Sequence, residues 1–120
     1  MANPNIVAVS SIYANTVMDA DVAASAVSLL TCGSNKVQKI NSLVIANIDG
    51  SNAASIDVFI TRSSVDYYLA KTISVPADAT LVVIDKNMGL YLMESDILKI
   101  QASAAGDLSA VCSYEEIDDA

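Results

Sequence analysis

Carboxylates are the only side chains that this sequence supplies in the numbers that acid–base chemistry needs. The chain has 14 Asp and Glu residues, six Lys and Arg residues and no histidine. The lack of histidine excludes Ser-His-Asp and Cys-His catalysis and His-ligated zinc. Two carboxylates alone can hydrolyse a glycosidic bond. The Asp residues mostly fall where turns are expected, at Asp49, Asp78, Asp85, Asp96 and Asp107, and turns favour Asp for backbone reasons. We therefore predict no enzymatic activity and no catalytic residues.

Metal and cofactor sites are also poorly supported by the residue types and their spacing. The two cysteines, Cys32 and Cys112, cannot form a four-thiolate zinc site, and no CxxC motif is present. The four glycines are too scattered for a phosphate-binding loop. The acidic run from Glu115 to Asp119 lacks the spacing of an EF-hand and favours a solvated tail or a patch facing a basic partner. We expect no cofactor and no metal.

Composition predicts one domain with an unusually apolar surface. Apolar residues make up 53% of the 120 residues and charged residues only 17%, with a net charge of −8. The few basic residues are scattered, which opposes binding to nucleic acid. The aliphatic runs are too short to cross a membrane, and no export signal precedes them. We expect a cytosolic protein whose two cysteines are buried thiols rather than a disulfide.

The elements that would position any site are β-strands. The stretch Val37 to Ile60 predicts a hairpin around the turn Asp49 to Asn52, because β-branched and apolar residues crowd both flanks. Further strands follow at short intervals with turn signals between them, and the last two are expected to pair. This pattern predicts an antiparallel β-sandwich of about eight strands, of jelly-roll or Ig-like type, spanning residues 1–120. The other expected strands are Ile6 to Tyr13, Tyr67 to Val75, Thr80 to Asp85, Leu90 to Met93, Ile97 to Ala102 and Leu108 to Ile117.

Two segments allow alternatives. Thr16 to Leu30 reads either as a short helix within residues 19–30, capped by Asp19 or Asp21, or as a loop leading into a strand near Ala26 to Cys32. Residues 1–9 form either the start of the first strand or an extended arm that reaches a neighbouring molecule by strand addition.

Apolar residues that point to both sides of a strand predict contact surfaces. In the strand before Asp49, Leu43 and Ile45 lie on the face opposite Ile40 and Val44, so one face needs a second partner. The adjacent Tyr67 and Tyr68 point to opposite faces, so that one is expected in the core and the other outward. The candidate interface residues are Ile6, Val7, Val9, Leu43, Ile45, Tyr67, Tyr68, Tyr91 and Met93.

From Val37 to Ile117, the order of segments resembles small virion structural proteins of tailed bacteriophages. The segments that carry the resemblance are SLVIANIDGSNAASIDV, YYLAKTISVPADATLVVI, LYLMESDILKIQASAAGDL and SYEEI, together with the opening MANPNIV.

The resemblance implies a non-enzymatic β-sandwich that decorates or cements the outer capsid surface. It implies the major capsid protein as the partner, a homotrimer as the oligomer, and assembly in the host cytoplasm. Similar modules serve as tail, neck or fibre-base components, which is the alternative. A sugar- or calcium-binding module for host recognition is a further alternative. The composition argues independently for docking, because the chain has more apolar strand surface than one core can bury.

Overall fold

The computed structural model describes residues 8–118, and this part of the chain consists of β-strands and the loops between them. The strands are β1 (Ser11–Asp19), β2 (Val27–Thr31), β3 (Lys36–Asn47), β4 (Ala54–Arg62), β5 (Val65–Val75), β6 (Thr80–Ile84), β7 (Leu90–Leu92), β8 (Ile97–Ala102) and β9 (Leu108–Asp118). The predicted all-β sandwich is confirmed. The predicted arm residues Ile6 and Val7 lie outside the described residues.

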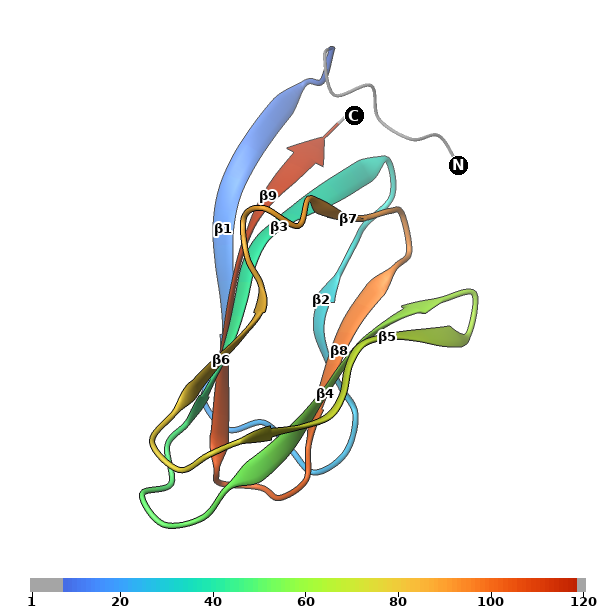
Figure 1. Cartoon of the computed structure of the whole chain (residues 1–120). Coiled ribbons are helices and arrows are strands. Elements are labelled where there is room, and N and C mark those ends of the chain that lie inside the picture. The colour runs from blue at the N-terminus through green and yellow to red at the C-terminus, as the bar shows by residue number, and fades with distance from the viewer. Residues whose placement is uncertain (1–7, 119–120) are drawn as a thin grey trace.

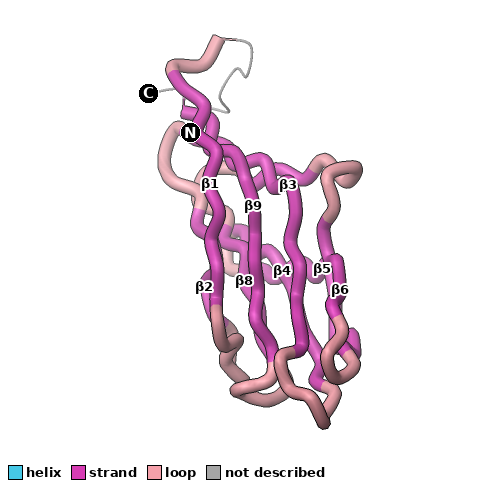
Figure 2. Tube along the Cα trace, turned by 90° about the vertical axis from the view of Figure 1, so that its left-hand side faces the viewer, coloured by secondary structure: helices cyan, strands magenta, loops and turns pink. Residues whose placement is uncertain are grey.

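The strands form two antiparallel sheets that face each other (Figures 1 and 2). Sheet A has the order β1-β9-β3-β6, with β7 also paired to β3, and sheet B has the order β2-β8-β4-β5. The pairs are nested, because β1 pairs with β9, β2 with β8, β3 with β6 and β4 with β5. This nesting is an antiparallel ribbon rolled into two sheets, which is the jelly-roll arrangement.

The core between the sheets is aliphatic. Leu43 and Ile45 of sheet A and Ile56, Val58 and Ile100 of sheet B are all completely buried. Each fully buried side chain of this size contributes about 1.5–3 kcal/mol through removal of apolar surface from water. Branched aliphatic residues suit this position, because they pack well on the pleated surface of a sheet. Packing of these side chains therefore holds the two sheets against each other.

The predicted hairpin around Asp49 to Asn52 is wrong. β3 pairs with β9 and β6 in sheet A, whereas β4 pairs with β5 and β8 in sheet B, so the turn carries the chain from one sheet to the other. The buried Asn47 fixes this crossing, because its side-chain amide donates to the carbonyls of Asn52 and Val75, both at 2.9 Å. The local turn signal was correct, since the Asp49 carboxylate accepts from the Ser51 amide at 2.8 Å. A turn signal fixes a reversal of direction but not the sheet that the next strand joins.

The expected pairing of the last two strands is wrong for the same reason. β8 pairs with β2 and β4 in sheet B, and β9 pairs with β1 and β3 in sheet A. The link between them therefore also crosses from one sheet to the other.

The segment from Thr16 to Leu30 contains no helix. β1 continues to Asp19, and a loop then leads into β2, which confirms the loop-and-strand alternative. The two candidate capping residues have other roles. The Asp19 carboxylate accepts from the Asp21 amide at 3.1 Å, and the Asp21 carboxylate accepts from the Gly106 amide at 2.7 Å. The loop is held further by Val22, which is completely buried and donates its amide to the Leu108 carbonyl.

A register shift in β3 decides which of its residues face the core. The shift lies between Ile40 and Ser42 opposite β9. Side chains alternate along a regular strand, and one inserted residue changes the phase of that alternation. As a result Ile40, Leu43 and Ile45 all lie in the core cluster, while Val44 lies on the other face of sheet A.

Candidate interaction surfaces

An apolar row crosses the outer face of sheet A. Met18 of β1 pairs with Val111 of β9, Val111 pairs with Val44 of β3, and Val44 pairs with Val82 of β6. Their inward neighbours Val17, Cys112 and Leu43 belong to the core side, so these four side chains point away from it. Met18 is 69% exposed, Val82 55% and Val111 37%. Four apolar side chains therefore form one band across four strands.

The rows on either side of the apolar row carry no charge. Together with the apolar row they form what we call the charge-free face. Its further members are Thr16, Ser42, Ser113, Ala46, Ser109 and Thr80, which occupy neighbouring outward positions in the same registers. Most of these side chains are short, and Figure 2 shows β1, β9, β3 and β6 side by side in this sheet. On a chain with a net charge of −8, a surface without carboxylates is suited to burial against a partner, because no charge has to be desolvated.

The outer face of sheet B is of a different kind, because it carries charged residues that pair with each other. The Asp57 carboxylate pairs with Lys71 at 3.3 Å and accepts from the Thr72 amide at 2.6 Å. The Lys71 ammonium lies 4.9 Å from the centre of the Tyr68 ring, which in turn lies 4.8 Å from the ring of Phe59. Because these charged and aromatic side chains already interact with one another, they are less available to a partner.

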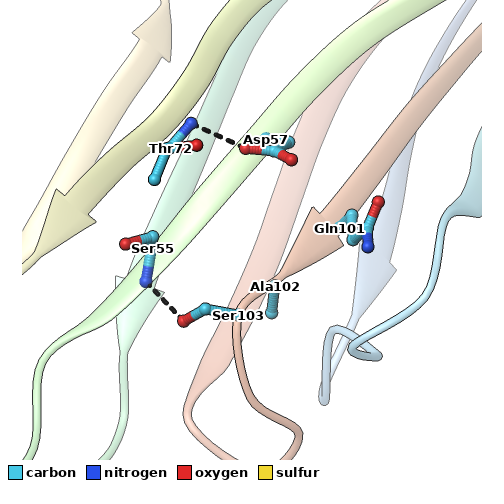
Figure 3. Close-up of a pocket in the computed structure, with 6 residues that line it drawn as sticks. All are labelled: Ser55, Asp57, Thr72, Gln101, Ala102 and Ser103. Atoms are coloured by element: carbon cyan, nitrogen blue, oxygen red, sulfur yellow. Dashed lines mark hydrogen bonds between the residues drawn. The ribbon is translucent and has the colours of Figure 1, made fainter.

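A shallow hollow of about 110 Å³ lies over β8, β4 and β5 of sheet B, where β4 begins and β8 ends (Figure 3). Its lining residues are Ser55, Asp57, Thr72, Gln101, Ala102 and Ser103. Figure 3 shows the Asp57 carboxylate turned toward the Thr72 amide and the Ser55 amide toward the Ser103 hydroxyl, which accepts at 2.8 Å. The volume is below the range typical of small-molecule sites, and no hydrogen bond joins the hydroxyl of Ser55 or Ser103 to the Asp57 carboxylate. The hollow therefore offers no arrangement for nucleophilic catalysis.

A second hollow of about 310 Å³ is lined by Ile60, Arg62 and Tyr67. Arg62 also holds the buried carboxylate of Asp96 through two hydrogen bonds, of 2.8 Å from Nε and 2.6 Å from an Nη. Burial raises the pKa of the Asp96 carboxyl, but the hydrogen bonds from Arg62 and from the Met93 amide lower the pKa by more, so the net shift is downward. Asp96 is thus a fixed anion that closes the turn between β7 and β8, which is a structural role.

The cysteines are buried thiols. Burial raises the pKa of Cys32 and of Cys112 to about 11. The Cys32 thiol also donates to the Lys36 carbonyl at 3.3 Å. Among residues 8–118, no group of three or more His, Cys, Asp or Glu side chains could hold a metal ion. In the same range, no helix is long and apolar enough to cross a membrane.

The structure corrects the expectation that Leu43 and Ile45 contact a partner. Both are completely buried in the core, because the register shift after Ile40 turns them inward. β3 is apolar on both faces as predicted, but the outward residue is their neighbour Val44.

The structure corrects the expectation that one of the two adjacent tyrosines lies in the core. Tyr67 is 56% exposed and Tyr68 46%, so neither lies in the core. They pair with Ile60 and Phe59 near the tip of the β4–β5 hairpin, which projects away from sheet A (Figure 1). Sheet A does not cover the face that Tyr67 occupies.

The other predicted interface residues within the described range, Tyr91, Met93 and Val9, lie apart from the apolar row. Tyr91 is 38% exposed and pairs with Lys39 in sheet A, but Met93 follows the end of β7 and is half-buried. Val9 is half-buried and precedes β1. Of the predicted residues within the described range 8–118, the structure brings none into the charge-free face.

The sequence did not predict the apolar row, because its residues become neighbours only when the four strands pair. Met18, Val44, Val82 and Val111 come from four strands separated in the sequence. The alternation within β9, where Val111 stands between the core residues Ala110 and Cys112, is the one local signal that indicates an outward valine. In β9 this outward valine stands between the small polar residues Ser109 and Ser113. Such a pattern indicates an outward apolar residue on an otherwise polar face.

Comparisons with known proteins support the fold. No protein-family model matches the sequence, and no curated protein matches it. A solved structure of Bacillus endospore appendages, described as a family of disulfide-linked pili, has a TM-score of 0.54 at 18% identity, over 92% of this chain and 90% of that chain.

Two viral structures are also similar. Infectious bursal disease virus VP2 has a TM-score of 0.49 at 14% identity, over 92% of this chain and 34% of that chain. A pentameric capsid protein from metagenomic phage sequences has a TM-score of 0.43 at 17% identity, over 87% of this chain and 64% of that chain. The chain thus spans about a third of the length of VP2. At these identities the likeness concerns the fold.

Proposed function

We propose that this protein is a non-enzymatic structural component of a bacteriophage virion that decorates the capsid and docks through the charge-free face. The observation that carries the proposal is the apolar row Met18–Val111–Val44–Val82, exposed in the middle of a surface without charges. The partner we propose is the major capsid protein, and the location is the outer capsid surface.

Three features support a docking role over a catalytic one. The described residues hold no nucleophile beside a base in either hollow. The neighbouring strands of sheet A give a broad, open surface, which suits binding to another protein better than enclosure of a small ligand. The resemblance of Val37 to Ile117 to phage virion proteins points to the same class.

The mechanism we propose is association alone. A module that contacts two neighbouring capsid subunits adds interface area that must be broken before the shell opens. Because many copies bind one particle, modest individual affinities add up to a large effect on particle stability. The resemblance favours a trimer, whereas the regular edge strand β1 favours twofold pairing.

The number of copies per particle tests the proposal. Quantitative mass spectrometry of purified virions should give copies in proportion to the major capsid protein, and virions without this protein should open at lower temperature. A few copies per particle would indicate the alternative, a tail, neck or fibre-base component. Absence of the protein from purified virions would overturn the virion role altogether.

A further inference from the structure

β1 is an edge strand of sheet A that lacks the usual protection of sheet edges. Its nine residues pair with β9 without any shift of register, from Ser11 opposite Asp118 to Asp19 opposite Ala110. Residues 11–18 include no charged residue, no proline and no glycine. Its side chains Ile12 and Tyr13 are 54% and 56% exposed. A long, regular and uncharged edge is a template for pairing with another strand.

The other edges of the two sheets are interrupted. β2 has five residues and a register shift between Ser28 and Leu30. β6 also has five residues, with a register shift in its pairing to β3. β5 carries Asp66 and Lys71, pairs with β4 through two register shifts, and has Thr72 at a φ of 53°. Only β1, among the edges in the described part of the chain, is both long and regular.

We propose that β1 pairs antiparallel with β1 of a second copy of this chain, about a twofold axis at Asn15. In this register Ile12 lies opposite Met18 of the second copy, Tyr13 opposite Val17, and Ala14 opposite Thr16. Residues directly opposite each other point to the same face, so both apolar pairs are matched. The strand is therefore complementary to itself when reversed, a property that pairing with an unrelated strand would not require.

The charges are compatible with this pairing although each copy carries −8. Asp19 lies opposite the neutral Ser11 of the second copy, and the two Asp19 residues are about 27 Å apart along the strands. Across the axis, Glu115 of one copy is aligned with the neutral Ser113 of the other copy. Glu116 is aligned in the same way with Cys112.

The closest aligned like charges belong to Asp118 of one copy and Asp19 of the other. They are two strand spacings apart, about 10 Å, where salt already screens their repulsion. No like charges are therefore placed in direct contact across the axis.

Such pairing would join the two A sheets into one continuous sheet, and the two charge-free faces would meet at the axis. The self-pairing goes beyond the proposed docking role and does not depend on it. The interface is isologous and closes at two copies, whereas pairing of β1 with a different edge would produce chains.

Charge pairs at residue 15 test the proposal. Asn15 is exposed, so Asn15→Asp and Asn15→Lys should both fold, which circular dichroism checks. Each variant places two like charges opposite each other at the axis, and we expect dimerisation at least about tenfold weaker than in the natural protein, measured by sedimentation equilibrium. An equimolar mixture of the two variants should restore it, because unlike charges then meet. Asn87→Asp, at an exposed turn position, is the control that adds the same charge elsewhere.

Each other outcome overturns the proposal. A natural protein that remains a monomer at several hundred micromolar has no such interface. A dimer that is equally weakened by Asn15→Asp and Asn87→Asp responds to net charge and not to the axis. A trimer, or an open polymer, requires different edges or faces.

Discussion

Leu43 and Val44 are neighbours in β3, yet Leu43 is completely buried in the core while Val44 stands on the outer face between Val111 and Val82. The two side chains therefore separate the two roles of the strand. One holds the sheets together, and the other belongs to the proposed docking surface.

Alanine substitutions at these two positions should have very different effects on stability. Leu43→Ala removes the branched end of a completely buried side chain and leaves a cavity, and we expect a loss of about 3 kcal/mol in the free energy of unfolding. Val44→Ala should cost less than about 1 kcal/mol, because its side chain is only half-buried. Urea unfolding of both variants measures the difference. Equal losses would contradict the assignment of Leu43 to the core and of Val44 to the outer face.

The strand content of this chain follows from local patterns, whereas the sheet partners do not. Ile97 to Ala102 was predicted with its observed ends, because apolar alternation and flanking turn residues define it locally. The hairpin around Asp49 failed because no local feature states whether a reversal stays within a sheet or crosses to the other one. The side chain that fixes the crossing, Asn47, acts through the Val75 carbonyl 28 residues further along the chain.

The proposed docking surface was only partly predictable for a related reason. That β3 is apolar on both faces can be read from its sequence. Which face is the core depends on the register shift between Ile40 and Ser42, and a shift arises from pairing with β9 and not from the residues of β3 alone. A shift of one residue in the pairing register would turn Leu43 outward and Val44 toward the core.

A charge in the apolar row should prevent docking without unfolding the protein. We expect Val44→Lys to change the free energy of unfolding by less than about 1 kcal/mol, because a lysine at an outward position can extend into water. Its occupancy on virions should fall at least about tenfold, because docking would bury an unpaired charge. Occupancy is measured by reconstitution onto particles that lack the protein.

Val65→Lys provides the matched control for this experiment, since Val65 is 50% exposed and lies on β5 of sheet B. Its occupancy should stay close to that of the natural protein. Retention of Val44→Lys at normal occupancy would show that docking uses another surface.

Loss of Arg62 should destabilise the fold strongly. Arg62→Ala leaves the buried Asp96 carboxylate without two of its hydrogen bonds, and we expect a loss of about 3 kcal/mol. Lys71→Ala removes an exposed ion pair to Asp57 and should cost less than about 1 kcal/mol. Chemical denaturation of both variants makes the comparison. Similar small losses would show that Arg62 only covers the surface.

Asp96 should also make stability depend on pH in the acid range. Its folded pKa is below the ordinary value, so its stabilising contribution is complete above the unfolded pKa of about 3.9 and is lost as the pH falls through the folded pKa. We expect the free energy of unfolding to fall below about pH 4, and to fall less steeply in Asp96→Asn. Unfolding curves at stepwise lower pH test this, and identical slopes would contradict it.

The two thiols should be inert until the protein unfolds. Because the pKa of both Cys32 and Cys112 is about 11, only roughly one thiol in ten thousand is ionised at pH 7, and both side chains are shielded from reagents. A disulfide reagent such as Ellman's should therefore label neither cysteine in the native protein and both in urea. Ser51→Cys, at an exposed turn, is the positive control and should react at once. Rapid labelling of either natural cysteine in native conditions would mean that the sandwich opens locally around that thiol.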